Sequence, residues 1–560
     1  MIILTQPEIT LCGTAVTPRE ARTGLRADEF RKSLEEDLAG KIQNGCFEIV
    51  PHVPPGEPIL RPIVTNTIKA DGTAKSRITA DDSSNPGEYP APTPLLEDIK
   101  IFIVAMVSHG KHIYLADAPK AFSNGTLEKP VYMHVPSGIP HTNQIYQSYP
   151  KNSDGQPPRL FIKIVGALEG MKPANQIWNN LVVQSLAATG YKPIPDAPCL
   201  HIRAPADSLA TPNGVAYHVD DFLIAVDTPI EHTDTLTSMR RHFDLKDMGE
   251  IGDSPKNVLG MEVAVNRETR TVTFTQQRLI AEMLSDTGQD RMHPTLLPMK
   301  PGTQLDPQVP NDTPTTDHDQ FTKPSDITEA KSLNGKILWI ARGTHPCISV
   351  ASNHIARRIS KPNRILMNAL KDVIRYLKGH ATAGMVFSPN NVTPAYRNKL
   401  LVYVDSDYAG DRKDQNGCCK STTGVLIFFN GAAVAHTCAK QQTVALHTME
   451  AETVAFSEGA RQTIPLRRIV TALGHPQHDP TETLGDNAAA IFNSVHATNS
   501  RKLRHLDIKW QYGRQAIAEK EVTLRSVPTA KNWANNLTKL EPLPRFRESF
   551  AAIMGHKSFY

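Results

Sequence analysis

The spacing of apolar residues along the chain predicts a mixture of helices and short strands. Apolar residues recur every four positions from Phe30 to Ile42 in a charged background, which is typical of one face of an amphipathic helix. A second helix is predicted from Gln176 to Ala188, with Gly190 as its stop signal. Between residues 48 and 80, short β-type runs alternate with turns, and Asp71-Gly72 predicts a hairpin.

The same patterns divide the chain into two parts. Residues 293–328 are rich in proline and threonine and carry little periodic apolar content, which indicates a linker. Helical patterning resumes at Lys331, and a β-rich unit begins near Lys399. Because strands and helices occur on both sides of the linker, we expect an α+β architecture.

Composition narrows the class of protein. The 560 residues exceed what one hydrophobic core usually serves, and 40% hydrophobic with 21% charged residues excludes a disordered chain. The seven scattered cysteines form no C-x-x-C pair, which argues against a disulfide framework or a zinc site. We find no signal peptide and no apolar run of membrane-spanning length, so we expect an intracellular protein without a membrane partner. Residues 501–560 hold twelve Lys and Arg against five Asp and Glu, which suits either a phosphate backbone or a solvated surface.

A first group of acids lies in apolar, strand-like surroundings. The run from Lys111 ends at Asp117, and Asp220-Asp221 is flanked on both sides by apolar β-formers, which predicts a hairpin with acids near its tip. Crowding three carboxylates is costly unless cations neutralise them. Two Mg²⁺ ions about 3.5–4 Å apart would do so, and would activate a primer 3′-hydroxyl and stabilise a leaving pyrophosphate. An ordinary Asp-Asp turn is the competing interpretation.

A second group of acids follows the linker. Asp405 ends an apolar strand, Glu450 and Glu452 begin a helical stretch, and Asp486 ends another short strand. Acids in this order suit the two-metal site of an RNase H fold, which cleaves the RNA of a hybrid with an activated water. Loop acids and helix caps are the alternative.

Taken together, these segments resemble the reverse transcriptase and RNase H portion of copia-type LTR-retrotransposon polyproteins. Asp117-Ala-Pro-Lys-Ala-Phe-Ser-Asn-Gly125 is similar to the family's Asp-Val-x-x-Ala-Phe-Leu-Asn-Gly, and Val219-Asp-Asp-Phe to its Val-Asp-Asp box. In the second half, Ser421-Thr-Thr-Gly424, Lys440-Gln-Gln-Thr and His505-Leu-Asp507 continue the similarity, which extends from about Phe30 to Leu540.

The resemblance implies a right-hand polymerase of fingers, palm and thumb, followed by a connection segment and an RNase H-like α/β domain. The expected boundaries are an N-terminal extension at 1–25, the reverse transcriptase at 26–292, the linker at 293–328, the connection at 329–395, the RNase H-like domain at 396–545 and a C-terminal tail at 546–560.

The resemblance also implies roles for individual residues of the first half. Phe122 would lie beneath the incoming sugar and select dNTPs, although an ordinary core phenylalanine is the alternative. Basic side chains on the predicted hairpin would contact the triphosphate, since cations pair with phosphate oxygens, and a solvated hairpin is the competing view. The implied metal ligands are Asp117, Asp220 and Asp221, and the implied triphosphate contacts are Lys69, Lys75 and Arg77.

In the second half, the resemblance implies that Asp405, Glu452 and Asp486 are catalytic acids and metal ligands, with Glu450 as a further candidate. The family's fourth acid is replaced by Asn535. An amide oxygen still ligates Mg²⁺, but one negative charge is lost and metal affinity follows ligand charge. We therefore expect weakened or absent RNase H activity.

Other positions depart from the family pattern. Pro173 replaces a Gln expected near the nascent base pair, Glu169 replaces a Tyr in the same segment, His218 replaces an aromatic, and Cys347 replaces an acid. These changes leave two main hypotheses. The chain is an RNA-directed DNA polymerase with an attached RNase H-like domain, or it is a decayed retroelement fragment that only binds nucleic acid. An unrelated two-metal phosphohydrolase is a third, weaker interpretation.

For the first hypothesis, the expected cofactor is Mg²⁺, two ions per active site, with Mn²⁺ as the substitute. The expected partners are an RNA template, a DNA primer, an RNA–DNA hybrid and dNTPs. The resemblance favours the cytoplasm, with the nucleus as the alternative.

Overall fold

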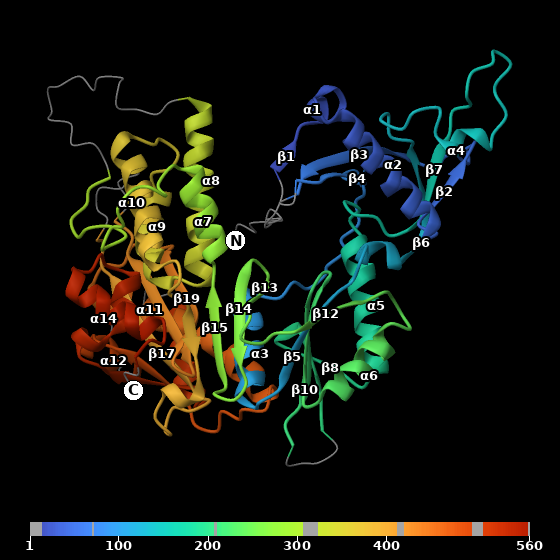
Figure 1. Ribbon diagram of the computed structural model, residues 1–560. Coiled ribbons are helices and arrows are strands. Elements are labelled where there is room, and N and C mark those ends of the chain that lie inside the picture. The colour runs from blue at the N-terminus through green and yellow to red at the C-terminus, as the bar shows by residue number, and fades with distance from the viewer. Residues whose placement is uncertain are drawn as a thin grey trace, which may run out of the picture.

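The computed structural model describes residues 14–69, 72–205, 210–305, 323–410, 419–495 and 508–557, the side chains of residues 14 and 508–510 excepted. Helices and four β-sheets alternate through these residues, which confirms the expected α+β class (Figure 1). None of the described helices combines the length and apolar character needed to cross a bilayer.

An N-terminal sheet of six strands forms the first layer. Its strand order is β1 (Thr14–Val16), β3 (Ile59–Ile68), β6 (Thr126–His134), β7 (Phe161–Gly166) and β2 (Phe47–Val50), with β4 (Ala74–Asp81) paired to the other edge of β3. The predicted hairpin is confirmed, because β3 and β4 are antiparallel, although residues 70 and 71 of its turn lie outside the described residues. Helix α2 (Ala27–Gln43) buries Phe30, Leu34 and Leu38 against this sheet, as their spacing predicts.

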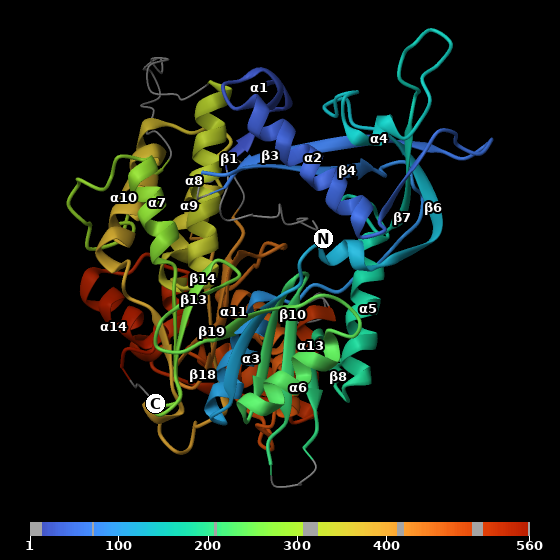
Figure 2. The ribbon, with the colours of Figure 1, turned by 45° about the vertical axis from the view of Figure 1, so that its right-hand side comes forward.

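A second six-stranded sheet follows, in the order β12 (Lys246–Glu250), β5 (His112–Asp117), β11 (Asp221–Val226), β10 (Asn213–His218), β9 (Ala197–Arg203) and β8 (Lys192–Ile194). Alternate residues of β5 enter different cores, since Tyr114 packs with Trp178 of α5 (Ala174–Ala188), whereas Ile113 packs with α3 (Leu96–Ser108). Helices α5 and α6 (Pro229–Met239) therefore cover one face and α3 covers the other (Figure 2).

The third sheet joins strands from both sides of the expected linker. β13 (Lys256–Val258), β14 (Met261–Asn266) and β15 (Thr271–Thr275) precede the linker, and β16 (Met385–Phe387) follows it and pairs with β15. Beside this sheet, a second core is formed by four helices: α7 (Gln277–Asp286), α8 (Pro324–Gly343), α9 (Ser349–Ala356) and α10 (Arg364–His380).

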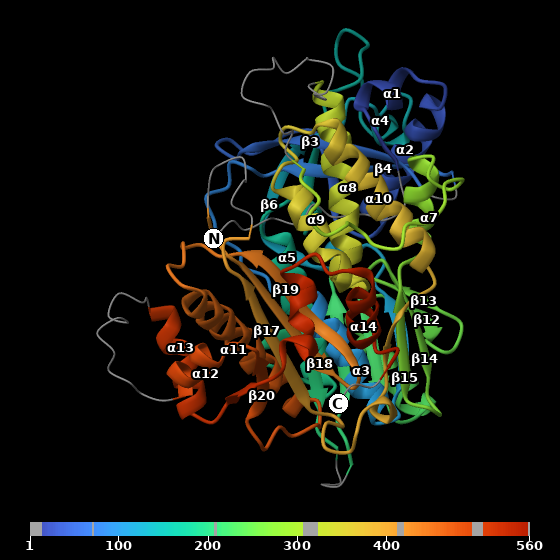
Figure 3. The ribbon, with the colours of Figure 1, turned by 90° about the vertical axis from the view of Figure 1, so that its left-hand side faces the viewer.

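The C-terminal sheet has five strands, in the order β19 (Ala432–Lys440), β18 (Thr422–Phe429), β17 (Leu400–Asp407), β20 (Thr481–Gly485) and β21 (Val522–Ser526). The pairs β19–β18–β17 are antiparallel, whereas β20 is parallel to both of its neighbours. Helix α11 (Thr448–Ala472) packs on this sheet, and α12 (Ala488–Val495) and α13 (Ile508–Ala518) lie beside α11 (Figure 3). Gly459 permits the close approach, since a Cβ there would lie 2.8 Å from a methyl group of Val404.

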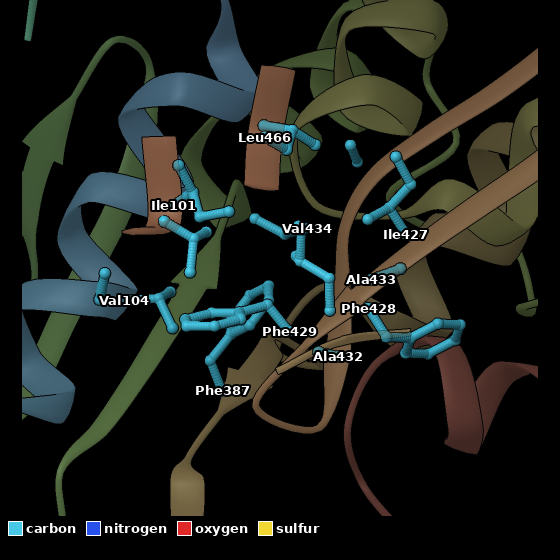
Figure 4. Packing of buried hydrophobic residues seen from close by; sticks show 14 of the residues in the cluster. Ile101, Val104, Phe387, Ile427, Phe428, Phe429, Ala432, Ala433, Val434 and Leu466 are labelled. Atoms are coloured by element: carbon cyan, nitrogen blue, oxygen red, sulfur yellow. The ribbon is translucent and has the colours of Figure 1, made fainter. Parts of the chain in front are cut away.

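One hydrophobic core connects the second, third and C-terminal sheets. Ile101 and Val104 of α3 pack near Phe387 of β16 and Phe429 of the C-terminal sheet (Figure 4). Residues 101–108 form an apolar run, and the helix that contains them is buried on all sides, as a helix without a polar face must be. Below it, the rings of His109 and His475 stack at 3.8 Å between centroids.

Structure extends into three segments that were expected to be peripheral. The 1–25 extension contains β1 and α1 (Pro18–Thr23), which pack on the N-terminal sheet. Helix α8 begins at Pro324, inside the expected linker, of which residues 306–322 lie outside the description. The expected tail from residue 546 lies largely within α14 (Leu543–Ile553), because an apolar stripe that includes Phe546 and Ile553 is buried.

Truncation of Phe429 tests this shared core. Phe429→Ala removes a fully buried ring, so we expect a loss of about 3–5 kcal/mol of unfolding free energy, measured by urea denaturation. Because the core is shared, circular dichroism and limited proteolysis of the N-terminal half should report the same transition. Leu446→Ala, at a 61% exposed position, is the control. An N-terminal half that unfolds at an unchanged urea concentration would contradict the shared core.

Candidate active site

Sheet register brings the first group of acids together. Asp221 begins β11 directly opposite Asp117, the last residue of β5. Asp220 lies in the two-residue turn between β10 and β11, and its carbonyl oxygen accepts a hydrogen bond of 2.9 Å from the Ala118 amide. The predicted hairpin with acids at its tip is therefore what the chain forms.

The tight turn that carries Asp220 is held in an unfavourable backbone conformation. Val219 has a φ of 55°, in the left-handed region that β-branched residues rarely adopt. The Trp178 indole of α5 donates a 2.7 Å hydrogen bond to the Val219 carbonyl, and the Val219 side chain packs against the core beneath the sheet. Tertiary contacts thus maintain a turn that local preference disfavours.

Mutual repulsion changes the protonation of these acids. Loss of hydration, followed by the charges of Asp220 and Asp117, raises the pKa of Asp221 to about 6, even though part of its surface reaches solvent. The pKa of Asp117 is also raised, by loss of hydration and by Asp220, while Lys246 opposes the increase. Asp117 and Asp221 line a cavity of about 520 Å³.

Lys246 is a site residue that the motif analysis missed. It lies on β12 opposite Asp117, on the other side of β5 from Asp221, and it lines the same cavity. Its position follows from the pairing of β12 with β5, which brings together residues far apart in the sequence.

Phe122 follows the strand that ends at Asp117. It belongs to the short helix η1 (Ala121–Asn124) that follows β5, and its half-buried ring packs between the cores of the N-terminal and second sheets. This position is compatible with a ring at the floor of a nucleotide site and equally with a structural wedge.

The predicted triphosphate contacts lie on the β3–β4 hairpin of the N-terminal sheet, whereas β5 and β11, which carry Asp117 and Asp221, belong to the second sheet (Figure 1). Lys75 and Arg77 point to the same face of β4, whereas Lys69 precedes the turn. The guanidinium of Arg77 lies 3.6 Å from the carboxylate of Glu169. The segment after Glu169 packs on β4, since the Lys172 amide donates a 3.0 Å hydrogen bond to the buried Asp82.

The second group of acids also converges. Asp405 at the end of β17, Glu452 in α11 and Asp486 after β20 each present an oxygen within 4.8 Å of the others. Asp405 and Glu452 are buried, and Asp486 is partly exposed. The further candidate, Glu450, does something else, since it accepts a 2.7 Å hydrogen bond from the Leu446 amide ahead of α11.

Burial and mutual repulsion raise the pKa values of two acids in this cluster. Loss of hydration, reinforced by Asp405 and Asp486, raises the pKa of Glu452 to about 8. Loss of hydration raises the pKa of Asp405 to about 6, although Lys539 and Thr538 both stabilise its charged form. A hard, oxygen-seeking cation fits such a donor set, because carboxylates that repel one another gain most from a shared positive charge.

The chain is similar to a reverse transcriptase family and to retrotransposon Pol polyproteins. A family model described as reverse transcriptase (RNA-dependent DNA polymerase) matches residues 70–301. The chain is 26% identical over 568 residues to the Retrovirus-related Pol polyprotein from transposon RE1 of Arabidopsis thaliana, which covers 99% of this chain and 36% of that protein. It is 23% identical over 540 residues to the Retrovirus-related Pol polyprotein from transposon TNT 1-94 of Nicotiana tabacum, covering 94% and 38%.

The chain is a copia-type retrotransposon Pol region with a reverse transcriptase domain. It spans 36% and 38% of the length of these two curated relatives. The expected resemblance is thereby confirmed for the Pol region and its reverse transcriptase domain. The matched residues 70–301 include Asp117, Asp220 and Asp221, whereas the second acid cluster lies outside them.

Neutralising Asp221 tests the repulsion in the Pol region's first acid group. A carboxyl pKa raised from 3.8 to about 6 disfavours the folded state once the group ionises, so its cost grows as pH rises from about 3.8 to about 6 and is complete above that range. In metal-free protein, Asp221→Asn should raise the unfolding temperature at about pH 7, and the gain should be much smaller near pH 4. Thermal unfolding in EDTA measures both, with Asp234→Asn, an exposed acid of α6, as the control. Equal gains at both pH values would refute the assignment.

Proposed function

We propose that this Pol region is an active RNA-directed DNA polymerase. The observation that carries the proposal is that strand register places Asp117 directly opposite Asp221 beside a cavity of about 520 Å³, with Asp220 in the adjoining turn. Bound cations would relieve the repulsion between these carboxylates. The proposed template is RNA, the primer is DNA, the substrates are dNTPs and the site of copying is the cytoplasm.

The arrangement of sheets supports a right-hand architecture. In this interpretation, the second sheet is the palm, the N-terminal sheet with its β3–β4 hairpin is the fingers, and the third sheet with α7 is the thumb. The α8–α10 helices are the connection. The C-terminal sheet, with three antiparallel strands, two parallel additions and α11 across it, is the RNase H-like domain.

Each residue of the first site then has a physical task. Asp117 and Asp221 are fixed by strand register, and Asp220 by its turn, and these three acids would hold the two Mg²⁺ ions. When bound, this pair of ions supplies activation of the primer 3′-hydroxyl and charge stabilisation of the leaving pyrophosphate. Lys246 limits the repulsion at Asp117. Phe122 lies under the sugar, and Lys69, Lys75 and Arg77 pair with the triphosphate.

We further propose that the second cluster acts on the RNA–DNA hybrid with reduced activity. Asp405, Glu452 and Asp486 support metal binding by their convergence, and Asn535 lies near them with an amide in place of the family's fourth acid. The lost negative charge would lower the affinity of the cluster for divalent cations, because metal affinity follows ligand charge.

Primer extension tests the polymerase directly. Purified protein should extend an oligo(dT) primer on poly(rA) with Mg²⁺ or Mn²⁺. Asp220→Asn should reduce incorporation at least about a hundredfold, because metal neutralisation at the reacting centre contributes several kcal/mol. Asp234→Asn should leave incorporation unchanged.

A decayed, nucleic-acid-binding fragment is the second candidate, and Pro173, Cys347 and Asn535 favour it. That candidate is supported if wild-type protein binds primer–template duplex but adds no nucleotide with either ion. Binding alone does not separate the candidates, because affinity for a polyanion falls with salt in both.

The pairing of Arg77 with Glu169 generates a separate kinetic prediction. If Arg77 contacts the triphosphate, it must exchange the Glu169 carboxylate for phosphate oxygens. Glu169→Gln should then lower the KM for dTTP several-fold and leave kcat nearly unchanged, since an exposed ion pair is worth up to about 1 kcal/mol. Steady-state extension measures this effect, with Glu57→Gln as an exposed control on the same half of the chain. An unchanged KM for dTTP would contradict the proposed contact between Arg77 and the triphosphate.

A further inference from the structure

The second acid cluster contains a cation supplied by the chain itself. The Nζ of Lys539 lies 3.3 Å from Oδ2 and 3.4 Å from Oδ1 of Asp405. It also donates a 2.8 Å hydrogen bond to Oδ1 of Asn535. The Thr538 hydroxyl donates to the same Asp405 carboxylate. The buried acid at the end of β17 is therefore already paired on the side that faces Asn535.

The orientation of the Asn535 amide is fixed by its surroundings. Its Nδ2 donates to the carbonyl oxygens of Thr529 at 3.0 Å and Asn532 at 2.9 Å. These bonds direct Oδ1 toward the Lys539 ammonium. A carboxylate at this position would place an oxygen against two carbonyl oxygens, which is unfavourable for a side chain that is 6% exposed. The residues around position 535 are thus arranged for an amide and a lysine together.

Counting charges shows what this pairing does. The three converging carboxylates carry three negative charges when ionised, and the Lys539 ammonium contributes one positive charge. The remainder, about two negative charges, matches a single divalent cation. A second divalent cation would share Asp405 with the Lys539 ammonium, and like charges only a few ångströms apart repel one another.

We propose that Lys539 holds the place of one metal ion, so that the cluster of Asp405, Glu452 and Asp486 takes one divalent cation rather than two. This inference rests on the proposed metal-binding role of the second cluster and does not involve the polymerase acids. The expected weakness of RNA–DNA hybrid cleavage then has two causes. The Lys539 ammonium occupies the place of one metal ion, and Asn535 replaces an acid. It also implies that Asn535→Asp alone does not restore a two-metal site.

Metal binding to the full chain tests the proposal without relying on activity. Asp220→Asn with Asp221→Asn serves as the background, so that ions at the first site do not obscure the second. In that background, Mn²⁺ titration followed by electron paramagnetic resonance and calorimetry should show one ion that Asp405→Asn removes. Adding Lys539→Met should increase the affinity for this ion at least about tenfold and allow a second Mn²⁺ ion to bind with lower affinity. Lys539→Arg, which keeps the charge, should bind a single ion as the background does.

Controls separate this effect from misfolding and from a general change of charge. Lys520→Met removes an exposed lysine of the same half and should leave Mn²⁺ affinity unchanged. If Lys539→Met does not fold, as judged by circular dichroism, Lys539→Gln replaces it. Two ions with Lys539 in place, no ion in any variant, or an affinity that stays constant or falls in Lys539→Met would each overturn the proposal.

Two further measurements separate the proposals from one another. Asn535→Asp should leave the background at one ion, and a second ion in that variant would also overturn the inference. Primer extension by the chain with its polymerase acids intact reports on the other proposal. If Lys539→Met changes Mn²⁺ binding as expected but the protein extends no primer, this inference is supported and the polymerase proposal is contradicted. If the protein extends primers but Lys539→Met does not change Mn²⁺ binding, the polymerase proposal is supported and this inference is contradicted.

Discussion

Repulsion between carboxylates is the constraint on which both halves of the molecule depend. Each half brings three acids together, and in each the pKa of at least one acid rises well above its ordinary value. Isolated segments would not hold such groups together, because water and distance would relieve the repulsion. The positions are imposed by strand register in the first half, and by two parallel strands with a packed helix in the second. The stability of the sheets is what opposes the repulsion.

That stability comes from a hydrophobic core that contains residues from both sides of the expected linker. Helix α3 is buried on all sides, and it contacts both the sheet of the first acids and the elements that carry the second. β16 adds a strand from beyond the linker to a sheet that begins before it. The relative placement of the two acid groups is therefore fixed by side-chain packing, not by the length of the linker.

Local patterns were sufficient to predict the elements with strong periodicity. The stripe beginning at Phe30, the β3–β4 hairpin and the hairpin that carries Asp220 all form as the sequence indicates. The boundaries were less predictable. The tail contains α14 because Phe546 finds a core built by residues far away in the chain. Lys246 escaped notice for the same reason, since its approach to Asp117 depends on the pairing of β12 with β5.

The two acid groups differ in how their charge is offset. At the first, Lys246 lies opposite Asp117 in the sheet and lines an open cavity with it, so the acids remain accessible to cations from solution. At the second, Lys539 contacts Asp405 directly and is tied to Asn535, so part of the charge is already satisfied within the fold. A motif comparison registers Asn535 as the loss of an acid. The structure adds that Asn535 orients Lys539 beside Asp405, so part of the negative charge of the cluster is offset within the fold.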